Sequence, residues 1–268
     1  MIRHLTLSDG RRLQYREQGT GPPLVLIHGW AMSSAVFDEA LGAFAETHRV
    51  LAPDLRGHGG SEGASGFGLE DLAGDLSEWF AALDLQGACL GGWSLGGQVA
   101  MALFPAVRQR VARLMLIDTT LRFVRSGDWP HGLPAGQVRA MARDLRRNYR
   151  KAMGEFFAGQ FVAGEISPER YRQVLAFAVR AGSLPEPETA LAALETLGCA
   201  DLRPRLSELD CPALVLHGEE DPITFPGAAR TLARDLLAGK LVLVPKSGHA
   251  PFLSRPGEVF ARWREFLS

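Results

Sequence analysis

Apolar residues along this chain follow two different spacings. Short apolar runs, mostly Val, Ile and Leu and each closed by a turn residue, occur at residues 24–27, 50–52, 114–117, 214–216 and 241–244. Runs of this length and composition are typical of buried strands. Between them, segments such as 69–83 have apolar residues at helical spacing. Because strands and helices alternate, we expect an α/β fold with a mostly parallel sheet covered by helices on both faces.

The alternation stops after Asp118 and resumes near Cys211. The intervening segment has Gly and Pro residues at its start, a Leu184-Pro185-Glu186-Pro187 break within it, and no obvious strand. Six Arg and Lys residues between 137 and 151 predict one basic helix there. The chain is therefore predicted to form a core from residues 1–120 and 199–268, with a helical cap at 121–198.

The N-terminal residues alternate in character and then turn at Asp9-Gly10, which predicts a strand rather than the unbroken apolar core of a signal peptide. No stretch approaches the roughly 18 consecutive apolar residues of a membrane span. The three cysteines, Cys89, Cys199 and Cys211, cannot all pair and lack the spacing of a zinc site. We therefore expect a monomer in the reducing cytoplasm that does not bind a membrane.

Length and charge narrow the function. With 268 residues and 46% hydrophobic content, the chain can form one large α/β domain. Its 29 Lys and Arg residues nearly balance 30 Asp and Glu residues, for a formal net charge of −1. The net charge of the protein is therefore too small to attract nucleic acid, and any recognition of a charged partner must depend on a local cluster of charges.

The most specific chemical motif is Gly92-Trp93-Ser94-Leu95-Gly96-Gly97, which lies between a small apolar run and a helix-like segment. A nucleophile elbow needs glycine on both sides of the serine, because the turn is strained and the helix passes close to the strand. In a chain with 30 glycines, a glycine-rich turn without chemistry is the alternative. The strand and helix context favours the elbow and makes Ser94 the candidate nucleophile.

A serine nucleophile needs a histidine base that is held by a carboxylate. His249 follows the last predicted strand and precedes the final helix, where the order nucleophile, acid, histidine places the base. His217, at the end of a strand, is the alternative. For the acid we prefer Asp221, on the loop after residues 213–216, to Asp118, which ends the strand at 114–117.

Acyl transfer also requires two backbone N–H donors for the developing oxyanion. Leu95 supplies one by its position after Ser94, and Trp30, in the turn after residues 24–27, is the candidate for the second. His28 and Gly29 are interpreted as support for that turn. The polar cluster from Asp54 to Ser61 fits a supporting loop better than a zinc site. Neither GxxxxGK[ST] nor GxGxxG follows a predicted strand, so we expect no cofactor and no metal.

Five motifs, in this order, resemble the α/β-hydrolase superfamily across nearly the whole chain: His28-Gly29-Trp30, Asp54 to Gly59, Gly92 to Gly97, the Asp221 loop and the His249 loop. Within it, the chain is similar to the pimeloyl-[acyl-carrier protein] methyl ester esterases of biotin synthesis. That likeness lies in Gly91 to Gly97, Asp128-Trp129-Pro130, Leu194-Glu195 through Asp201-Leu202-Arg203, and His249 to Ser254 followed by Pro256. It implies a serine carboxylesterase that releases methanol from pimeloyl-acyl carrier protein methyl ester.

The resemblance also implies roles for individual residues. Ser94, Asp221 and His249 match the nucleophile, acid and base, and Trp30 and Leu95 line the acyl site beside the oxyanion. A substrate-contacting stretch of the cap corresponds to Phe156, Phe157, Ala158, Gly159 and Gln160, with packing inside the cap as the alternative for the two phenylalanines. The basic cap that receives an acidic carrier protein corresponds to Arg139, Arg143, Arg146, Arg147 and Arg150, with a solvated helix face as the alternative.

Two features depart from these esterases. Residues 3–18 resemble a full strand pair, and Arg56-Gly57-His58-Gly59 is the loop of generic esterases. The alternative function is therefore a generic esterase, lactonase or carbon–carbon bond hydrolase that acts on a small free substrate. A dehalogenase would need a carboxylate at position 94. A binding protein without turnover is disfavoured because all three triad residues are present.

Overall fold

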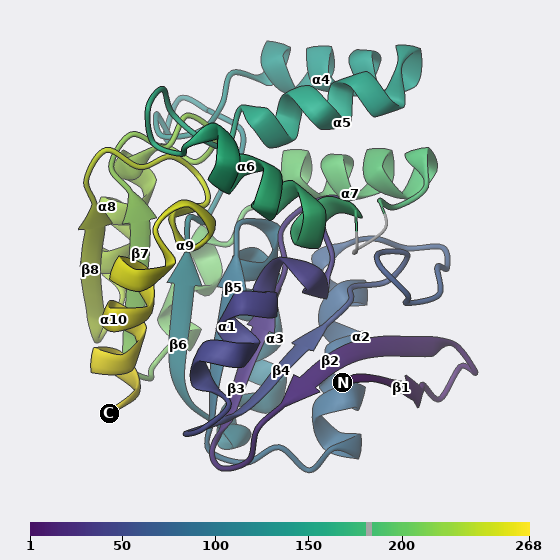
Figure 1. The fold of residues 1–268 in the computed structure, drawn as a ribbon, viewed down its shortest axis with the longest axis vertical. Helices are drawn as coiled ribbons and strands as arrows, with labels where there is room; N and C mark the ends of the chain where they lie inside the picture. The colour runs from purple at the N-terminus through teal and green to yellow at the C-terminus, as the bar shows by residue number, and fades with distance from the viewer. Residues whose placement is uncertain (181–183) are drawn as a thin grey trace.

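The computed structural model describes residues 1–180 and 184–268 and is built around one eight-stranded sheet (Figure 1). The strand order is β1-β2-β4-β3-β5-β6-β7-β8. The strands are β1 (Ile2–Thr6), β2 (Arg12–Gln18), β3 (Pro23–Ile27), β4 (Arg49–Pro53), β5 (Ala88–Trp93), β6 (Val111–Ile117), β7 (Ala213–Gly218) and β8 (Gly239–Val244). The pairs β1–β2 and β2–β4 are antiparallel, and all other neighbouring strands are parallel. The predicted α/β class and the predicted strands are confirmed.

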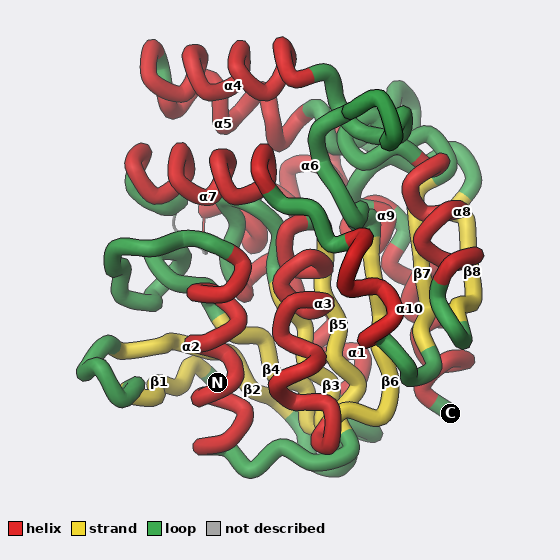
Figure 2. Tube along the Cα trace, turned by 180° about the vertical axis from the view of Figure 1, so that it is seen from behind, coloured by secondary structure: helices red, strands yellow, loops and turns green. Residues whose placement is uncertain are grey.

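Helices cover both faces of this sheet, as expected. In Figure 1, α1 (Asp38–Phe44) and α10 (Pro256–Leu267) lie on the near face. The view from behind in Figure 2 shows α2 (Leu69–Ala82), α3 (Leu95–Val107) and α8 (Pro226–Asp235) on the other face. Every residue of β5 and β7 is buried. This two-sided burial explains why these strands are continuous apolar runs without alternation.

Four longer helices lie between β6 and β7 in the chain: α4 (Ala135–Arg147), α5 (Tyr149–Ala158), α6 (Pro168–Val174) and α7 (Pro187–Cys199). Figure 1 shows them together above the sheet. The shorter segments are α9 (Pro251–Ser254), η1 (Ser34–Phe37), η2 (Arg108–Arg110), η3 (Leu175–Arg180) and η4 (Arg203–Glu208). No helix in the described residues has the length and apolar character needed to cross a membrane. The core and cap boundaries remain predictions, and α7 ends one residue beyond the predicted cap.

The prediction of one basic helix over 137–151 is wrong, because the segment is divided between α4 and α5. Asn148 separates them with φ −155° and ψ 85°, which is far from helical geometry. Its side chain accepts a hydrogen bond from the backbone N–H of Lys151 at 3.2 Å. Asn148 is therefore the N-cap of α5, and its side chain provides an acceptor for a backbone N–H of the first turn of that helix.

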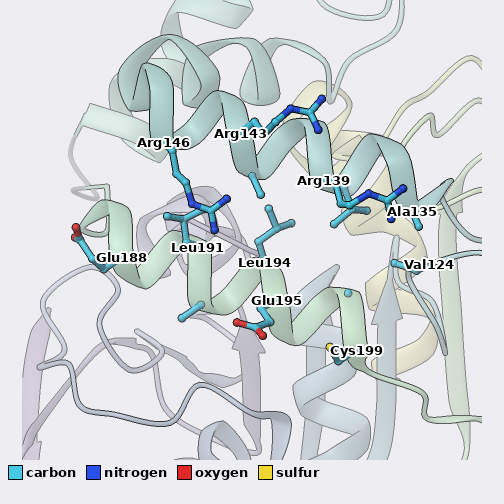
Figure 3. Close-up of a pocket in the computed structure, with 14 residues that line it drawn as sticks. Val124, Ala135, Arg139, Arg143, Arg146, Glu188, Leu191, Leu194, Glu195 and Cys199 are labelled. Atoms are coloured by element: carbon cyan, nitrogen blue, oxygen red, sulfur yellow. The ribbon is translucent and has the colours of Figure 1, made fainter.

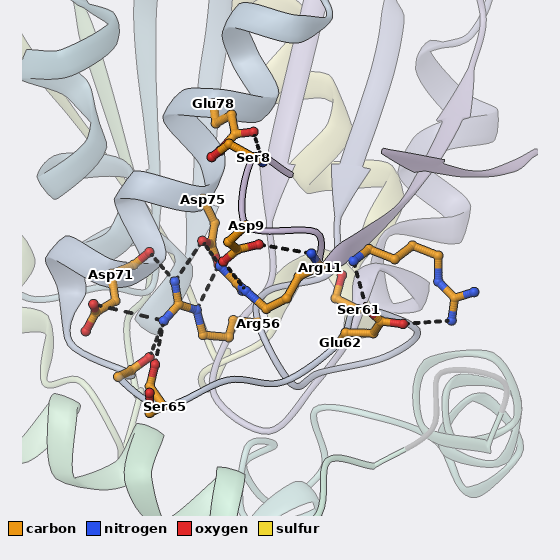
Figure 4. Close-up of polar contacts among 12 residues, drawn as sticks. Ser8, Asp9, Arg11, Arg56, Ser61, Glu62, Ser65, Asp71, Asp75 and Glu78 are labelled. Carbon is orange, nitrogen blue, oxygen red and sulfur yellow. Dashed lines mark hydrogen bonds and ion pairs between the residues drawn. The ribbon is translucent and has the colours of Figure 1, made fainter. Parts of the chain in front are cut away.

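A buried arginine fastens the loop after β4 to helix α2 (Figure 4). Arg56 donates to both carboxylate oxygens of Asp75, at 2.8 and 2.7 Å, and to the carbonyl of Gly66 at 2.6 Å. Arg11 reaches the same carboxylate from the β1–β2 turn at 2.9 and 2.6 Å. Burial alone would raise the pKa of Asp75, but these two guanidinium groups lower it below its ordinary value. The N-terminal hairpin, the loop and α2 therefore share one carboxylate.

We expect Asp75→Asn to lower the free energy of unfolding by about 3 kcal/mol at pH 7, because it leaves two arginines without their shared partner. Since the pKa of Asp75 is depressed in the fold, its contribution is present above the ordinary pKa and is lost as the pH falls through the lower, folded value. Urea unfolding at neutral and acidic pH measures both effects. Asp9→Asn removes an exposed Arg11 partner and serves as the control. An equal loss in both variants would contradict the prediction.

Candidate active site

Ser94 lies at the sharp turn between β5 and α3. Its backbone has φ 56° and ψ −118°, a strained conformation for a residue with a side chain. A Cβ atom at Gly92 would lie 2.1 Å from the carbonyl oxygen of Gly96, and a Cβ atom at Gly96 would lie 2.1 Å from the carbonyl oxygen of Ile27. Both glycines are therefore required by close backbone contacts, as expected for an elbow that presents a serine.

Three residues that are distant in sequence form one hydrogen-bonded row. The His249 Nε2 atom lies 2.9 Å from the Ser94 Oγ atom, and the His249 Nδ1 atom lies 2.7 Å from the Asp221 Oδ2 atom. Ser94 follows β5, Asp221 follows β7 and His249 follows β8, so all three lie beyond the carboxyl ends of parallel strands. Their exposed fractions are 8%, 2% and 1%. This geometry can move a proton from a hydroxyl to an imidazole whose other nitrogen faces a carboxylate.

The Asp221 carboxylate is fixed by its own turn. Its Oδ1 atom accepts from the backbone N–H groups of Ile223 at 2.7 Å and Thr224 at 3.0 Å, and the Thr224 hydroxyl donates to Oδ2 at 2.7 Å. Burial alone would raise the pKa of Asp221, but the neighbouring His249 and the hydrogen bonds from His249 and the Thr224 hydroxyl lower it below the ordinary value. Asp221 is therefore an ionised carboxylate at neutral pH.

Asp118, the other candidate acid, has a different environment. It is fully buried at the end of β6, and its Oδ1 atom accepts from the Gly218 backbone N–H at 2.7 Å. Burial and the nearby Asp221 charge raise the pKa of Asp118 well above its ordinary value. The surroundings thus shift the pKa values of the two carboxyl groups beside His249 in opposite directions, downward for Asp221 and upward for Asp118, an arrangement suited to acid–base chemistry.

Asp118, Asp221 and His249 also form the one group of side chains in the described chain whose donor atoms, all within 4.8 Å of one another, could hold a cation. Two of these donors are already bonded directly to each other, between His249 and Asp221. The third belongs to Asp118, whose raised pKa favours the neutral form, a poor ligand for a cation. The donor set therefore suits proton transfer better than metal binding.

His217, the alternative base, and His28 each support a neighbouring turn. The His217 Nε2 atom lies 2.5 Å from the Thr224 carbonyl oxygen, and burial lowers the pKa of His217. His217 therefore stabilises the turn that contains Asp221 and Thr224. The Nδ1 atom of His28 lies 2.8 Å from the Gly29 carbonyl oxygen, and Nε2 accepts from the Leu55 backbone N–H at 3.0 Å. These contacts match the predicted supporting role of His28.

The two predicted oxyanion donors belong to segments beside Ser94. Leu95 is the first residue of α3, where a backbone N–H has no acceptor within the helix. A Cβ atom at Gly29 would lie 3.2 Å from the Ser94 Cβ atom, so the turn that contains Trp30 passes next to the serine. The Trp30 indole donates to the Ala190 carbonyl of α7 at 2.8 Å. Trp30 thus connects the serine turn to the cap.

The predicted substrate-contacting stretch divides between the site and the cap interior. The ring of Phe156 packs edge-on against the ring of Trp30, with 4.7 Å between the ring centroids. Phe157 instead packs against Phe161 and Tyr171 inside the cap. Ala158 and Gly159 are exposed. Gln160 is fully buried, its carbonyl accepts from the His249 backbone N–H at 2.7 Å, and its side-chain amide has no hydrogen-bond partner in the described residues.

The cap arginines line and flank a groove of about 860 Å³ between α4 and α7 (Figure 3). Arg139, Arg143 and Arg146 lie along its α4 side, and Leu191 and Leu194 lie on its α7 side. Arg147 lies near the end of α4, and Arg150 lies in α5. All five guanidinium groups belong to exposed residues, and none forms an ion pair within residues 1–180 and 184–268. The basic α4 side of the groove thus faces an α7 side on which Leu191 and Leu194 lie together with Glu188 and Glu195.

Two polar residues at the site were not predicted from the sequence. Thr224 hydrogen-bonds to Asp221 and lies 3.2 Å from the His249 Nδ1 atom. The spacing of Asp221 and Thr224 fits a turn in which the Asp side chain accepts from backbone N–H groups a few residues later, and this pattern could have identified Thr224. Glu165 contacts the histidine loop from the cap. No spacing in the sequence connects it to residues 247 and 248.

Comparisons with known proteins agree with the fold. Residues 22–256 match the family model of the alpha/beta hydrolase fold. The chain is 37% identical over 238 residues to a pimeloyl-[acyl-carrier protein] methyl ester esterase of Nitrosomonas europaea, covering 89% of this chain and 92% of the relative. It is 35% identical over 250 residues to the esterase of the same name from Nitrosospira multiformis, covering 91% of this chain and 93% of that relative.

Solved structures extend the likeness over the whole chain. An esterase from Exiguobacterium antarcticum superposes with a TM-score of 0.93 at 22% identity, covering 99% of both chains, which supports the fold alone. A thermophilic esterase from Thermogutta terrifontis has a TM-score of 0.84 at 29% identity, covering 100% of this chain and 98% of that one. An enol-lactonase from Burkholderia xenovorans has a TM-score of 0.86 at 26% identity, covering 99% of each.

The two buried carboxyl groups are expected to respond differently to amide substitution. Asp221→Asn should lower kcat/KM for p-nitrophenyl butyrate by about 10⁴-fold, because the amide favours the wrong imidazole tautomer. Asp118→Asn changes a group that is hydrogen-bonded to Gly218 and not to His249, and whose raised pKa favours the neutral form, so it should lower kcat/KM by less than about tenfold. Steady-state kinetics on both folded variants measure this contrast. A larger loss for Asp118→Asn than for Asp221→Asn would exchange the two assignments.

Proposed function

The chain belongs to the alpha/beta hydrolase fold family, among the pimeloyl-[acyl-carrier protein] methyl ester esterases, and we propose that it hydrolyses the methyl ester of pimeloyl-acyl carrier protein in biotin synthesis. The enzyme is a carboxylic ester hydrolase. The observation that carries the proposal is the row from Ser94 through His249 to Asp221, with distances of 2.9 and 2.7 Å. The products would be methanol and the free ω-carboxylate of the pimeloyl chain on its carrier.

In the proposed acylation step, the His249 Nε2 atom takes the hydroxyl proton while the Ser94 Oγ atom attacks the ester carbonyl carbon. The backbone N–H groups of Trp30 and Leu95 stabilise the oxyanion of the tetrahedral intermediate. Asp221 stabilises the imidazolium. The bond to the methoxy oxygen then breaks, His249 returns the proton to it, and methanol leaves an acyl group on Ser94.

In the proposed deacylation step, a water molecule takes the place of methanol. His249 accepts a proton from the water as its oxygen attacks the acyl carbonyl carbon, and the same two backbone N–H groups stabilise the second oxyanion. The bond to Ser94 Oγ breaks as His249 returns the proton to that oxygen. The pimeloyl chain leaves as a carboxylic acid, which ionises at neutral pH. The difference in pKa between Asp221 and Asp118 supports Asp221 as the group that faces the imidazolium in both steps.

The cap supports a substrate that is attached to an acidic protein. The ring of Phe156 against Trp30 offers an apolar surface for an acyl chain near Ser94. The free side-chain amide of buried Gln160 is available to a polar group of the substrate. The exposed guanidinium groups of α4 and α5 can attract an acidic carrier protein. We propose that the stretch from Phe156 to Gln160 contacts the acyl part and that the arginines contact the carrier.

A second candidate function is hydrolysis of a small free ester or lactone. It is favoured by the Thermogutta terrifontis esterase and the Burkholderia xenovorans enol-lactonase, which superpose along nearly the full chain. This function would use the same three residues and would leave the cap arginines without a partner. We further propose that the enzyme is cytoplasmic and that it is a monomer. The monomer is supported by how few large apolar side chains are strongly exposed in the described residues: Met1, Ile2 and Leu237.

Ser94→Ala should reduce kcat for p-nitrophenyl butyrate at least 10³-fold, because no other group can form the acyl-enzyme. Stopped-flow measurement of p-nitrophenol release checks this, and the burst of the wild type should be absent from the variant. Circular dichroism of the variant controls for folding. Turnover at the wild-type rate in folded Ser94→Ala would refute the mechanism.

Charge reversal in the cap separates carrier-bound from free substrates. The double variant Arg143→Glu and Arg147→Glu should lower kcat/KM for pimeloyl-acyl carrier protein methyl ester by about tenfold or more at low salt, with a smaller effect as salt rises. Turnover of p-nitrophenyl butyrate should stay within about twofold, because exposed charges contribute little to stability.

The matched control for this double variant is Arg262→Glu, on α10 away from the cap (Figure 1). The Arg262 side chain is 53% accessible, and it forms an ion pair with Glu265 of the same helix at 3.5 Å. It should leave hydrolysis of both substrates unchanged. Equal losses on both substrates in the cap variant would contradict carrier recognition and favour the small-substrate function.

A further inference from the structure

The turn between α5 and α6 contains a buried carboxylate that the proposed chemistry does not use. Glu165 is 9% exposed and belongs to the predicted cap. Four donors converge on it: the Ser247 hydroxyl at 2.7 Å, the Ser254 hydroxyl at 2.5 Å, and the backbone N–H groups of Gly248 and Val162, both at 2.8 Å. Two of these donors lie immediately before His249 in the chain. A carboxylate in the cap is therefore bonded directly to the loop of the proposed base.

That loop joins β8 to α9 and depends on outside contacts for its position. Lys246 has φ 52°, in the left-handed region that residues with a side chain avoid. A Cβ atom at Gly248 would lie 2.3 Å from the Gln160 carbonyl oxygen, and the His249 N–H donates to that same oxygen at 2.7 Å. The cap turn thus holds two consecutive backbone N–H groups, one through Glu165 and one through Gln160.

Attachment of the cap to the core does not by itself explain this carboxylate. Arg170 of α6 already makes that connection, since it donates to the Leu253 carbonyl at 3.0 and 2.7 Å and to both carboxylate oxygens of Glu39. Burying a carboxylate is unfavourable unless its hydrogen bonds are complete. What Glu165 adds is acceptors for Ser247 and Gly248, which directly precede His249 in its loop, and for Ser254 at the end of α9.

We infer that Glu165 is a positioning residue: it fixes Ser247 and Gly248 so that His249 stays aligned with Ser94. This inference rests on the proposed ester hydrolysis. The alignment matters because a misplacement of about 1 Å at a reacting group can cost roughly 100-fold in rate. The His249 Nε2 to Ser94 Oγ distance of 2.9 Å is the quantity that Glu165 protects.

Two substitutions of Glu165 separate hydrogen bonding from charge. Glu165→Leu keeps a similar size and removes all acceptors, so kcat for p-nitrophenyl butyrate should fall about 10- to 100-fold while KM stays within about twofold. In Glu165→Gln, the amide oxygen can accept from the two backbone N–H groups while its NH₂ donates to the two serine oxygens. That variant should keep kcat within about threefold of the wild type.

A matched pair of serine substitutions tests the same inference without disturbing the carboxylate. Ser247 and Ser254 both donate to the Oε1 atom of Glu165, but Ser247 belongs to the histidine loop and Ser254 ends α9. Ser247→Ala should lower kcat about tenfold, and Ser254→Ala should stay within about twofold. Titration of the burst counts competent serines, so that each kcat refers to folded enzyme.

The outcomes are decisive in each case. A folded Glu165→Leu with wild-type kcat overturns the positioning role, as does a Glu165→Gln that is as slow as the Leu variant. Should Glu165→Leu fail to fold, the serine pair decides, and equal effects of Ser247→Ala and Ser254→Ala overturn the role. If Ser94→Ala is inactive but the Glu165 and serine variants do not show the expected losses of kcat, only the positioning role of Glu165 fails. If folded Ser94→Ala is active, the proposed function itself fails.

Discussion

The close crossing of helix α3 over strands β3 and β5 is the constraint on which the site depends. The backbone of Gly96 lies against the Ile27 carbonyl, and Gly92 lies against Gly96, so neither position has room for a Cβ atom. The connection between β5 and α3 must then turn within one residue, and Ser94 takes the strained conformation that results. The serine hydroxyl is presented beyond the sheet because the backbone has no other way to join these two elements.

Around this turn, burial and hydrogen bonding give similar side chains different states. Two carboxyl groups cannot both ionise easily in a small buried space. Asp221 receives two backbone N–H groups, a hydroxyl and an imidazole, which favour its charged form. Asp118 has one backbone donor on one oxygen and no partner in the described chain for the other. The site therefore favours a negative charge on Asp221, which faces His249, over one on Asp118 beside it.

The sequence contained enough information for the sheet, the elbow and the order of the three candidate residues, because each depends on local pattern or on chain order. Buried strands appear as apolar runs, and the glycines of the elbow reflect a local steric need. The preference for Asp221 over Asp118 rested on position in the chain, since both follow a parallel strand and only tertiary contacts distinguish their surroundings. The break at Asn148 was missed because asparagine also occurs within helices. The contacts of Glu165 join residues 82 positions apart, which no local pattern records.

Exchange of caps between enzymes of this fold meets a restriction that follows from the turn between α5 and α6. In a transplanted cap, different side chains would face Ser247 and Gly248. The histidine loop of the recipient enzyme would still have the conformation that fits the hydrogen-bond acceptors of its original cap. Residues 160 to 165 and residues 246 to 249 therefore behave as two halves of one joint. A chimaera that takes both segments from one parent enzyme keeps the hydrogen bonds between them. A chimaera that takes the two segments from different parents needs these contacts redesigned before His249 can be positioned for catalysis.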